Sequence, residues 1–140
     1  MSTTRQQIAD YLKTLLDTAT VKTVVTTNSG GAGLTDYREI DVPLVEIFIG
    51  EEIPQYEVGR HALVVDGARV VVHYLSDGAI EEQELLIGEI KDALGGDPTL
   101  GGLVEMVNIV RIEPGGEYPL YNITFILSVE YEKHIAVSEE

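Results

Sequence analysis

The stretch IEEQELLIGEIKDALGGDPTLGGLVEMVNIVRIEPGGEYPLYNITFILSVEY (residues 80–131) decides the fold, because it holds an amphipathic helix, a glycine-rich exit and two apolar strands. At 100° per residue, the apolar side chains of the helix fall on one arc and the charged ones on the opposite arc. The apolar arc comprises Ile80, Leu86, Ile87, Ile90, Ala93 and Leu94. The charged arc comprises Glu81, Glu82, Glu84, Glu89, Lys91 and Asp92. One face of this helix is therefore predicted to be buried.

Both ends of the helix carry recognisable signals. Ser76 and Asp77 precede it, and either side chain is expected to accept hydrogen bonds from the free N–H groups of the first turn. At the other end, Gly95-Gly96 is expected to take the left-handed C-cap conformation, and Asp97-Pro98 prevents continuation.

Two strands are predicted after the helix. Residues 103–112 are apolar on both faces, with Met106, Val110 and Ile112 on one and Val107 and Ile109 on the other. Residues 113–117 (Glu-Pro-Gly-Gly-Glu) are expected to break this strand with a turn. Residues 121–131 alternate, and their apolar series is Ile123, Phe125, Leu127, Val129 and Tyr131. Such alternation places one face of the last strand on the core.

The first half of the chain adds a second helix and more strands. Thr3 or Thr4 is expected to cap a helix that buries Ile8 and Leu12. Strands are predicted at residues 21–27 and 44–49, an edge segment at 54–58, and a long β stretch at 60–74. Within that stretch, Asp66-Gly67 fits either a hairpin turn or a bulge in one long strand. The whole predicts a single domain over residues 1–140 of the α+β class, with two amphipathic helices packed on a mainly antiparallel β-sheet.

Composition excludes several classes of function. The 140 residues include no cysteine, which excludes disulfides, thiol nucleophiles and cysteine-based zinc sites. No apolar run reaches the length of a membrane span, and the N-terminus leads into an amphipathic helix and not into a signal peptide. With 24 acidic against 9 basic residues the net charge is −15, which argues against gripping nucleic-acid phosphates. The acidity fits either a solubility surface or a surface past which DNA slides.

Catalytic patterns are weak throughout. The glycine run at 30–33 is not followed by the Gly-Lys-Ser/Thr of a phosphate loop. Glu51 and Glu52 are neighbours, so in extended chain they point to opposite sides, and a solvated turn is favoured over a metal site. His61, His73 and His134 have no metal-ligand spacing, and no serine lies in a nucleophile elbow. No catalytic residue, metal or cofactor is expected.

The order of elements resembles a known family. An N-terminal amphipathic helix precedes a proline-initiated strand that runs into Gly-Glu-Glu (43–52) and a long valine-rich strand. A helix then ends in Asp-Ala-Leu-Gly-Gly-Asp-Pro-Thr-Leu-Gly-Gly (92–102), followed by two strands. Over most of its length the chain resembles the tail-completion proteins of tailed bacteriophages, particularly the tail terminator group.

The resemblance implies a structural protein and not an enzyme. Such proteins form a ring, commonly a hexamer, that caps the head-proximal end of the tail tube, ends tube polymerisation and offers a docking surface for head-tail joining. The implied partners are further copies of the chain, the tail tube protein and the head-tail connector or neck protein, while DNA passes through without specific binding. The implied location is the virion tail or neck, with assembly in the host cytoplasm.

Several residues are candidates for these contacts. Leu85 and Ile126 are apolar residues on otherwise polar faces, which a neighbouring subunit would cover. Two loops are expected to order on partners, and their candidate interface residues are Asp36, Tyr37, Arg38, Glu117 and Tyr118. Glu51, Glu52 and Glu57 are candidates for an acidic lumen that repels DNA phosphates.

Two other functions stay open. Another neck or minor tail component would share the fold and differ in whether it binds the open end of a tube. A small monomeric ligand-binding or enzymatic domain would need a polar cluster in a cleft, and the sequence displays none.

Overall fold

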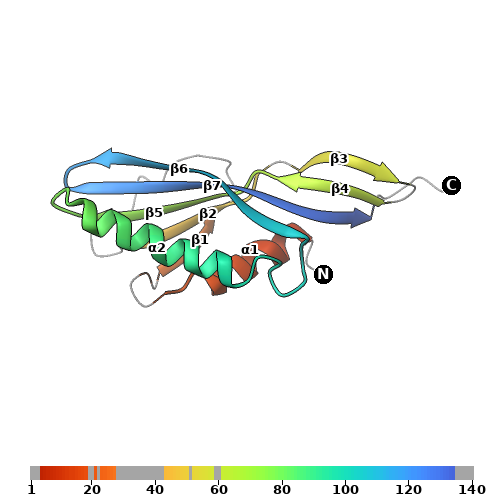
Figure 1. Ribbon diagram of the computed structural model, residues 1–140, viewed down its shortest axis with the longest axis horizontal. Coiled ribbons are helices and arrows are strands. Elements are labelled where there is room, and N and C mark those ends of the chain that lie inside the picture. Colours follow the sequence, from red (N-terminus) through yellow and green to blue (C-terminus); the bar gives the residue numbers. More distant parts are fainter. Residues whose placement is uncertain are drawn as a thin grey trace.

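The computed structural model describes residues 4–18, 21, 23–27, 43–50, 52–58 and 61–134, which form two helices and a seven-stranded sheet (Figure 1). This is the predicted α+β class. The helices are α1 (Thr4–Leu15) and α2 (Ile80–Gly96). The strands are β1 (Thr23–Thr27), β2 (Leu44–Phe48), β3 (Glu52–Val58), β4 (His61–Asp66), β5 (Arg69–Leu75), β6 (Met106–Glu117) and β7 (Leu120–His134).

The longest strand, β7, lies in the middle of the sheet. It pairs with β6 along one edge and with both β5 and β4 along the other, all antiparallel. Asp66 pairs with Val129 and Arg69 with Ile126, so the register continues unbroken from β4 into β5. The N–H of Leu127 donates to the carbonyl of Ala68 across the gap, at 2.9 Å. Asp66-Gly67 is therefore neither a hairpin turn nor a bulge: it lies at a short break between β4 and β5, which follow each other along β7 without a shift of register.

The remaining strands extend the sheet outward. β2 pairs antiparallel with β5, β1 pairs parallel with β2, and β3 pairs antiparallel with β4. The sheet is thus mainly antiparallel, as predicted. β3 ends the strand order on its side, which agrees with the edge segment predicted at 54–58.

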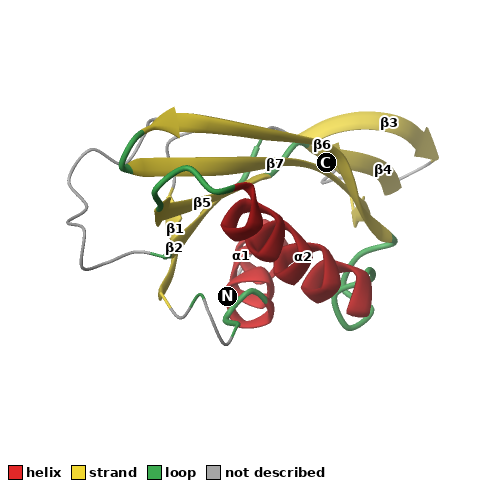
Figure 2. Cartoon of the chain, turned by 60° about the vertical axis from the view of Figure 1, so that its left-hand side comes forward, coloured by secondary structure: helices red, strands yellow, loops and turns green. Residues whose placement is uncertain are grey.

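Both helices lie on the same face of the sheet (Figure 2). α1 contributes Ile8 and Leu12 to the core, and α2 contributes Leu86, Ile90 and Leu94. From β7 the buried side chains are Ile123, Phe125, Leu127, Val129 and Tyr131. The alternation predicted for this strand is confirmed, because every second side chain meets the helices.

The break predicted at residues 113–117 is wrong, because β6 continues to Glu117. Among the described strands β6 pairs only with β7, and at an edge Pro114 can be accommodated although it lacks an N–H. The register of β6 shifts between Ile109 and Arg111 and leaves Val110 bulged and exposed. Because of this extra residue, Ile112 packs against the core as Ile109 does, and not on the face predicted for it.

The residues that were predicted to cap the two ends of α2 have other roles in the structure. Ser76 Oγ accepts the N–H of Gly78 at 2.9 Å and Asp77 Oδ1 that of Ala79 at 3.1 Å, so both shape the turn before the helix. Gly95 and Gly96 stay helical and do not take the left-handed conformation that was predicted for them. The residues that do take it come later in the chain. These are Leu100, Gly101 and Gly102, with φ of 49°, 68° and 91°.

A carboxylate is buried on β2. All five residues of this strand are buried, and Glu46 is only 1% exposed. Its Oε1 lies 3.3 Å from Nε2 of His73 on β5. A buried carboxylate is tolerated only with hydrogen-bonding partners, so His73 has a structural role here.

We expect His73→Ala to lower the free energy of unfolding by about 1.5–3 kcal/mol, because it removes a hydrogen bond to a buried charged group. Chemical denaturation measures this loss. Ser128→Ala, a small change on β7, serves as the control and should change stability little. A loss no larger than that of the control would show that His73 does not support Glu46.

Gly88 lies in the interior of α2 without a structural reason within the described chain. A Cβ atom added there meets nothing within 4 Å. We expect Gly88→Ala to raise the free energy of unfolding by about 0.5–1 kcal/mol, because alanine is the better helix former. Gly101→Ala is the opposite control, since φ is 68° and the new Cβ would lie 2.9 Å from the Tyr11 hydroxyl. Equal effects of the two variants in denaturation would contradict this account.

Candidate assembly surfaces

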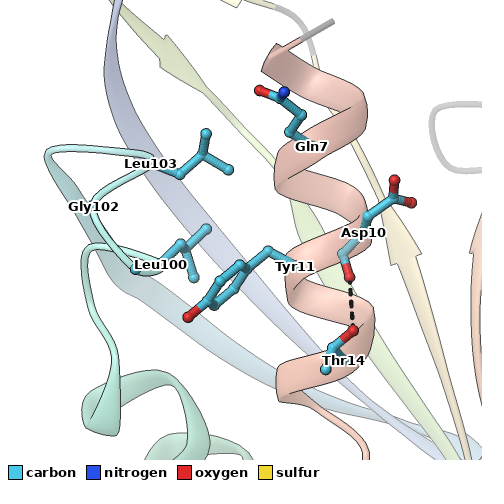
Figure 3. A pocket seen from close by; sticks show the side chains of 8 residues that line it. Gln7, Asp10, Tyr11, Thr14, Leu100, Gly102 and Leu103 are labelled. Carbon is cyan, nitrogen blue, oxygen red and sulfur yellow. Dashed lines mark hydrogen bonds between the residues drawn. The ribbon is translucent and has the colours of Figure 1, made fainter. Parts of the chain in front are cut away.

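A shallow hollow of about 570 Å³ separates α1 from the loop that follows α2. Figure 3 shows Tyr11 reaching from α1 toward this loop, with Leu100 and Leu103 facing it. The Tyr11 hydroxyl donates a hydrogen bond to Asp97 Oδ2, and Asp97 Oδ1 accepts the N–H of Gly101 at 2.9 Å. Asp97 therefore ties the glycine-rich exit of α2 to the first helix.

This contact changes the acidity of both side chains. The hydrogen bond from Tyr11 and the backbone N–H of Gly101 lower the pKa of Asp97. Acceptance by the carboxylate raises the pKa of Tyr11, with smaller contributions from burial and from the negative charge of Asp97. The hydrogen bond from Tyr11 to Asp97 is fully formed at pH values between the two pKa values, where Asp97 is ionised and Tyr11 is protonated.

The contact should therefore stabilise the fold over a limited pH range. The lowered pKa of Asp97 contributes stability that is present above 3.8, its ordinary value, and lost as the pH falls through the folded value. The raised pKa of Tyr11 contributes stability that is present below 10.0 and lost as the pH rises through the folded value. We expect Tyr11→Phe to lower the unfolding temperature near neutral pH, with the difference from wild type shrinking at both extremes. A difference independent of pH would contradict this account.

The residues that the structure describes include no group of three or more potential metal ligands. Sequence spacing did not reveal that His61 and His134 are direct partners across β4 and β7, because strand pairing brings them together. None of the described helices is long and apolar enough to cross a membrane.

Large exposed apolar side chains occur where β6 turns into β7 and at the first residue of α2. Ile80, Tyr118 and Leu120 are exposed to 61%, 71% and 42%, and we call them the tip patch. The N–H of Ser76 donates to the carbonyl of Pro119 at 3.0 Å, which ties the segment that precedes α2 to this turn. Tyr118 was predicted as an interface residue. Ile80 was predicted on the buried arc, but it lies at the first residue of α2 and stays exposed.

On the sheet face away from the helices, three strands align a row of side chains. Arg69 pairs with Ile126, and Ile126 pairs with Arg111, so all three project from the same face. The guanidinium carbon of Arg69 lies 5.1 Å from the ring centroid of Phe48, which is opposite it on β2. Arg111 Nε donates to Glu113 Oε2 at 2.7 Å. We call Arg69, Ile126 and Arg111 the arginine row.

The outer side of α2 is acidic, in contrast to the arginine row. Leu85 is 58% exposed, as predicted, and stands among acidic side chains. At 100° per residue, one strip of the helix surface collects the residues that point away from the core. This strip, the helix ridge, consists of Glu81, Glu84, Leu85, Gly88 and Asp92. It lies on the helix layer, whereas Ile126 lies on the opposite face of the sheet, so one chain does not bring Leu85 and Ile126 together.

The other predicted contact residues are described only in part. Asp36, Tyr37, Arg38 and Glu51 lie outside the described residues. Glu52 and Glu57 belong to the edge strand β3, where they pair with Asp66 and Ala62. Glu117 is exposed at the end of β6, beside Tyr118. The roles expected for all of them stay predictions.

No protein-family model matches the chain, and no curated protein matches it either. Among solved structures, the chain is similar to a chain of the virion of the native gene transfer agent particle. The two share 11% sequence identity over 92% of this chain and 90% of that chain, with a TM-score of 0.41. A similarity this weak does not establish a shared function.

Proposed function

We propose that this protein is a structural component of a phage-type virion, and specifically a tail terminator. In this role it forms a ring on the head-proximal end of the tail tube, ends tube polymerisation and presents a docking surface to the head-tail connector. The order of elements and the exit at 92–102 support the family. The tip patch is the structural observation that carries the proposal.

The tip patch suits end-on contact with another protein. Large apolar side chains that stay exposed together mark interaction sites more often than scattered ones do. Here Tyr118 and Leu120 flank Pro119, and the hydrogen bond from Ser76 to Pro119 brings the segment before Ile80 beside them. In a ring every copy presents this end to the same side. The tips then form an annular apolar face that can cover the end of a tube.

The acidity fits a passage for DNA. At a net charge of −15, a ring of such chains repels phosphates and does not trap DNA that moves through it. Glu51, Glu52 and Glu57 are our candidates for the lumen. The partners in this proposal are further copies of the chain, the tube protein and the connector or neck protein, and the location is the virion.

Light scattering coupled to size exclusion tests the proposal, over a concentration series and with or without the cognate tube protein. Negative-stain microscopy of the main species then identifies rings, free or on tube ends. A strict monomer that ignores tubes at every concentration would overturn the proposal. Rings that never bind an open tube end would favour another neck or minor tail component.

The tip patch gives a sharper variant. We expect Tyr118→Ser to leave the ring mass unchanged and to weaken tube capping about tenfold or more, because a central aromatic anchor is lost. Binding to tube ends is counted by microscopy against protein concentration. Val110→Ser, at an exposed apolar position within β6 and away from the turn, is the matched control. Equal capping by wild type, Tyr118→Ser and Val110→Ser would remove the tip patch from the tube contact.

A further inference from the structure

We infer that neighbouring copies meet by docking the helix ridge of one chain onto the arginine row of the next. This inference rests on the proposed ring and names the two surfaces that build it. It commits to a second copy of the chain as the occupant of both surfaces.

The layering of the fold gives the contact its geometry. The helices cover one face of the sheet, and none of the described helices lies on the other face (Figure 2). The helix ridge and the arginine row thus lie on opposite sides of a two-layer molecule. A contact between two different surfaces of one chain is heterologous, and with a closing rotation it produces a ring. Every copy in such a ring uses each surface once.

Charge complementarity favours a second copy over an unrelated occupant. The ridge presents the carboxylates of Glu81, Glu84 and Asp92. The row presents two arginines, in a chain with only 9 basic residues against 24 acidic ones. Glu113 takes one donor of Arg111, but a guanidinium has five, so further carboxylates can bind. Glu130 also lies on β7, but it pairs with Met106 and is four residues from Ile126, so its carboxylate does not lie beside the two arginines.

The two surfaces also match in their apolar centres. Leu85 stands among the ridge carboxylates, and Ile126 stands between the two arginines. Leu85 is exposed among charged side chains, and Ile126 is half-buried on a face that also carries Phe48 and Val71. Stacking the ridge on the row lets these two side chains cover each other while the charges pair around them.

Gly88 supplies an independent sign of close approach. It lies one turn from Leu85 on the ridge, and a Cβ atom there would meet nothing within 4 Å among the residues that the structure describes. A glycine in the middle of a helix costs stability without a benefit inside the monomer. On the ridge it leaves a notch where the side chains of the arginine row can approach the helix backbone.

Two single variants and their mixture test the inference. Leu85→Asp disables the ridge and Ile126→Asp disables the row, and each is checked for folding by circular dichroism. We expect each alone to raise the protein concentration needed for half assembly about tenfold or more. Mixed together they should form a 1:1 complex and nothing larger, because only one ridge and one row remain intact in the pair.

Gly88→Ala separates the interface from folding. It should make the monomer more resistant to denaturant and yet weaken assembly, an outcome that loss of fold cannot produce. Tyr118→Ser is the control outside the contact and should leave assembly unchanged. Added salt should also weaken assembly, because the charges around Leu85 and Ile126 are screened.

The outcomes distinguish this inference from the proposed function. Rings that persist in Leu85→Asp and Ile126→Asp would overturn the ridge-to-row contact and leave the tail-terminator proposal standing. A wild-type chain that never forms rings, with or without tubes, would overturn both. Single variants that stay monomeric, with a mixture that stops at the 1:1 complex, support the contact.

Discussion

The pairing of β7 along both of its edges is the constraint on which the rest of the structure depends. One edge holds β6, and the other holds β4 and β5 in a single unbroken register. With both edges paired, the side chains of β7 must alternate strictly between the two faces. The series from Ile123 to Tyr131 thereby fixes which face receives the helices. The same alternation puts Ile126 between Arg69 and Arg111 on the other face.

Much of the fold could be predicted from the sequence because its signals are local. Helical periodicity located α1 and α2, and alternation located the buried side of β7. The errors arose where distant residues decide the outcome. Proline and glycine at 114–116 indicate a turn locally, but pairing with β7 carries β6 through to Glu117. The unbroken register past Asp66-Gly67 also depends on β7, which lies more than fifty residues away in the chain.

The same contrast between local signals and distant contacts decides which candidate surface residues could be identified from the sequence. Leu85 and Ile126 were identified because a single element reveals an apolar residue in a polar setting, and Tyr118 because it lies in a loop. The arginine row was not, because Arg69, Ile126 and Arg111 come from three strands that only the sheet aligns. The sequence alone did not single out Gly88, because one glycine in a helical pattern is not informative. Its proposed role in the contact depends on the structure, where an added Cβ atom meets no described atom within 4 Å. The pair of Tyr11 and Asp97 likewise joins two elements that are 86 residues apart.

The irregular outer strands have a consequence for how copies of the chain can join. β6 carries the Val110 bulge and Pro114, and β3 carries Pro54 with a register shift beside it. Each irregularity interrupts the run of backbone donors and acceptors that an incoming strand would need. Along these two strands the sheet cannot continue from one molecule into the next as an endless ribbon. In the ring that we propose, contacts at these two strands would therefore involve side chains and not a continued sheet.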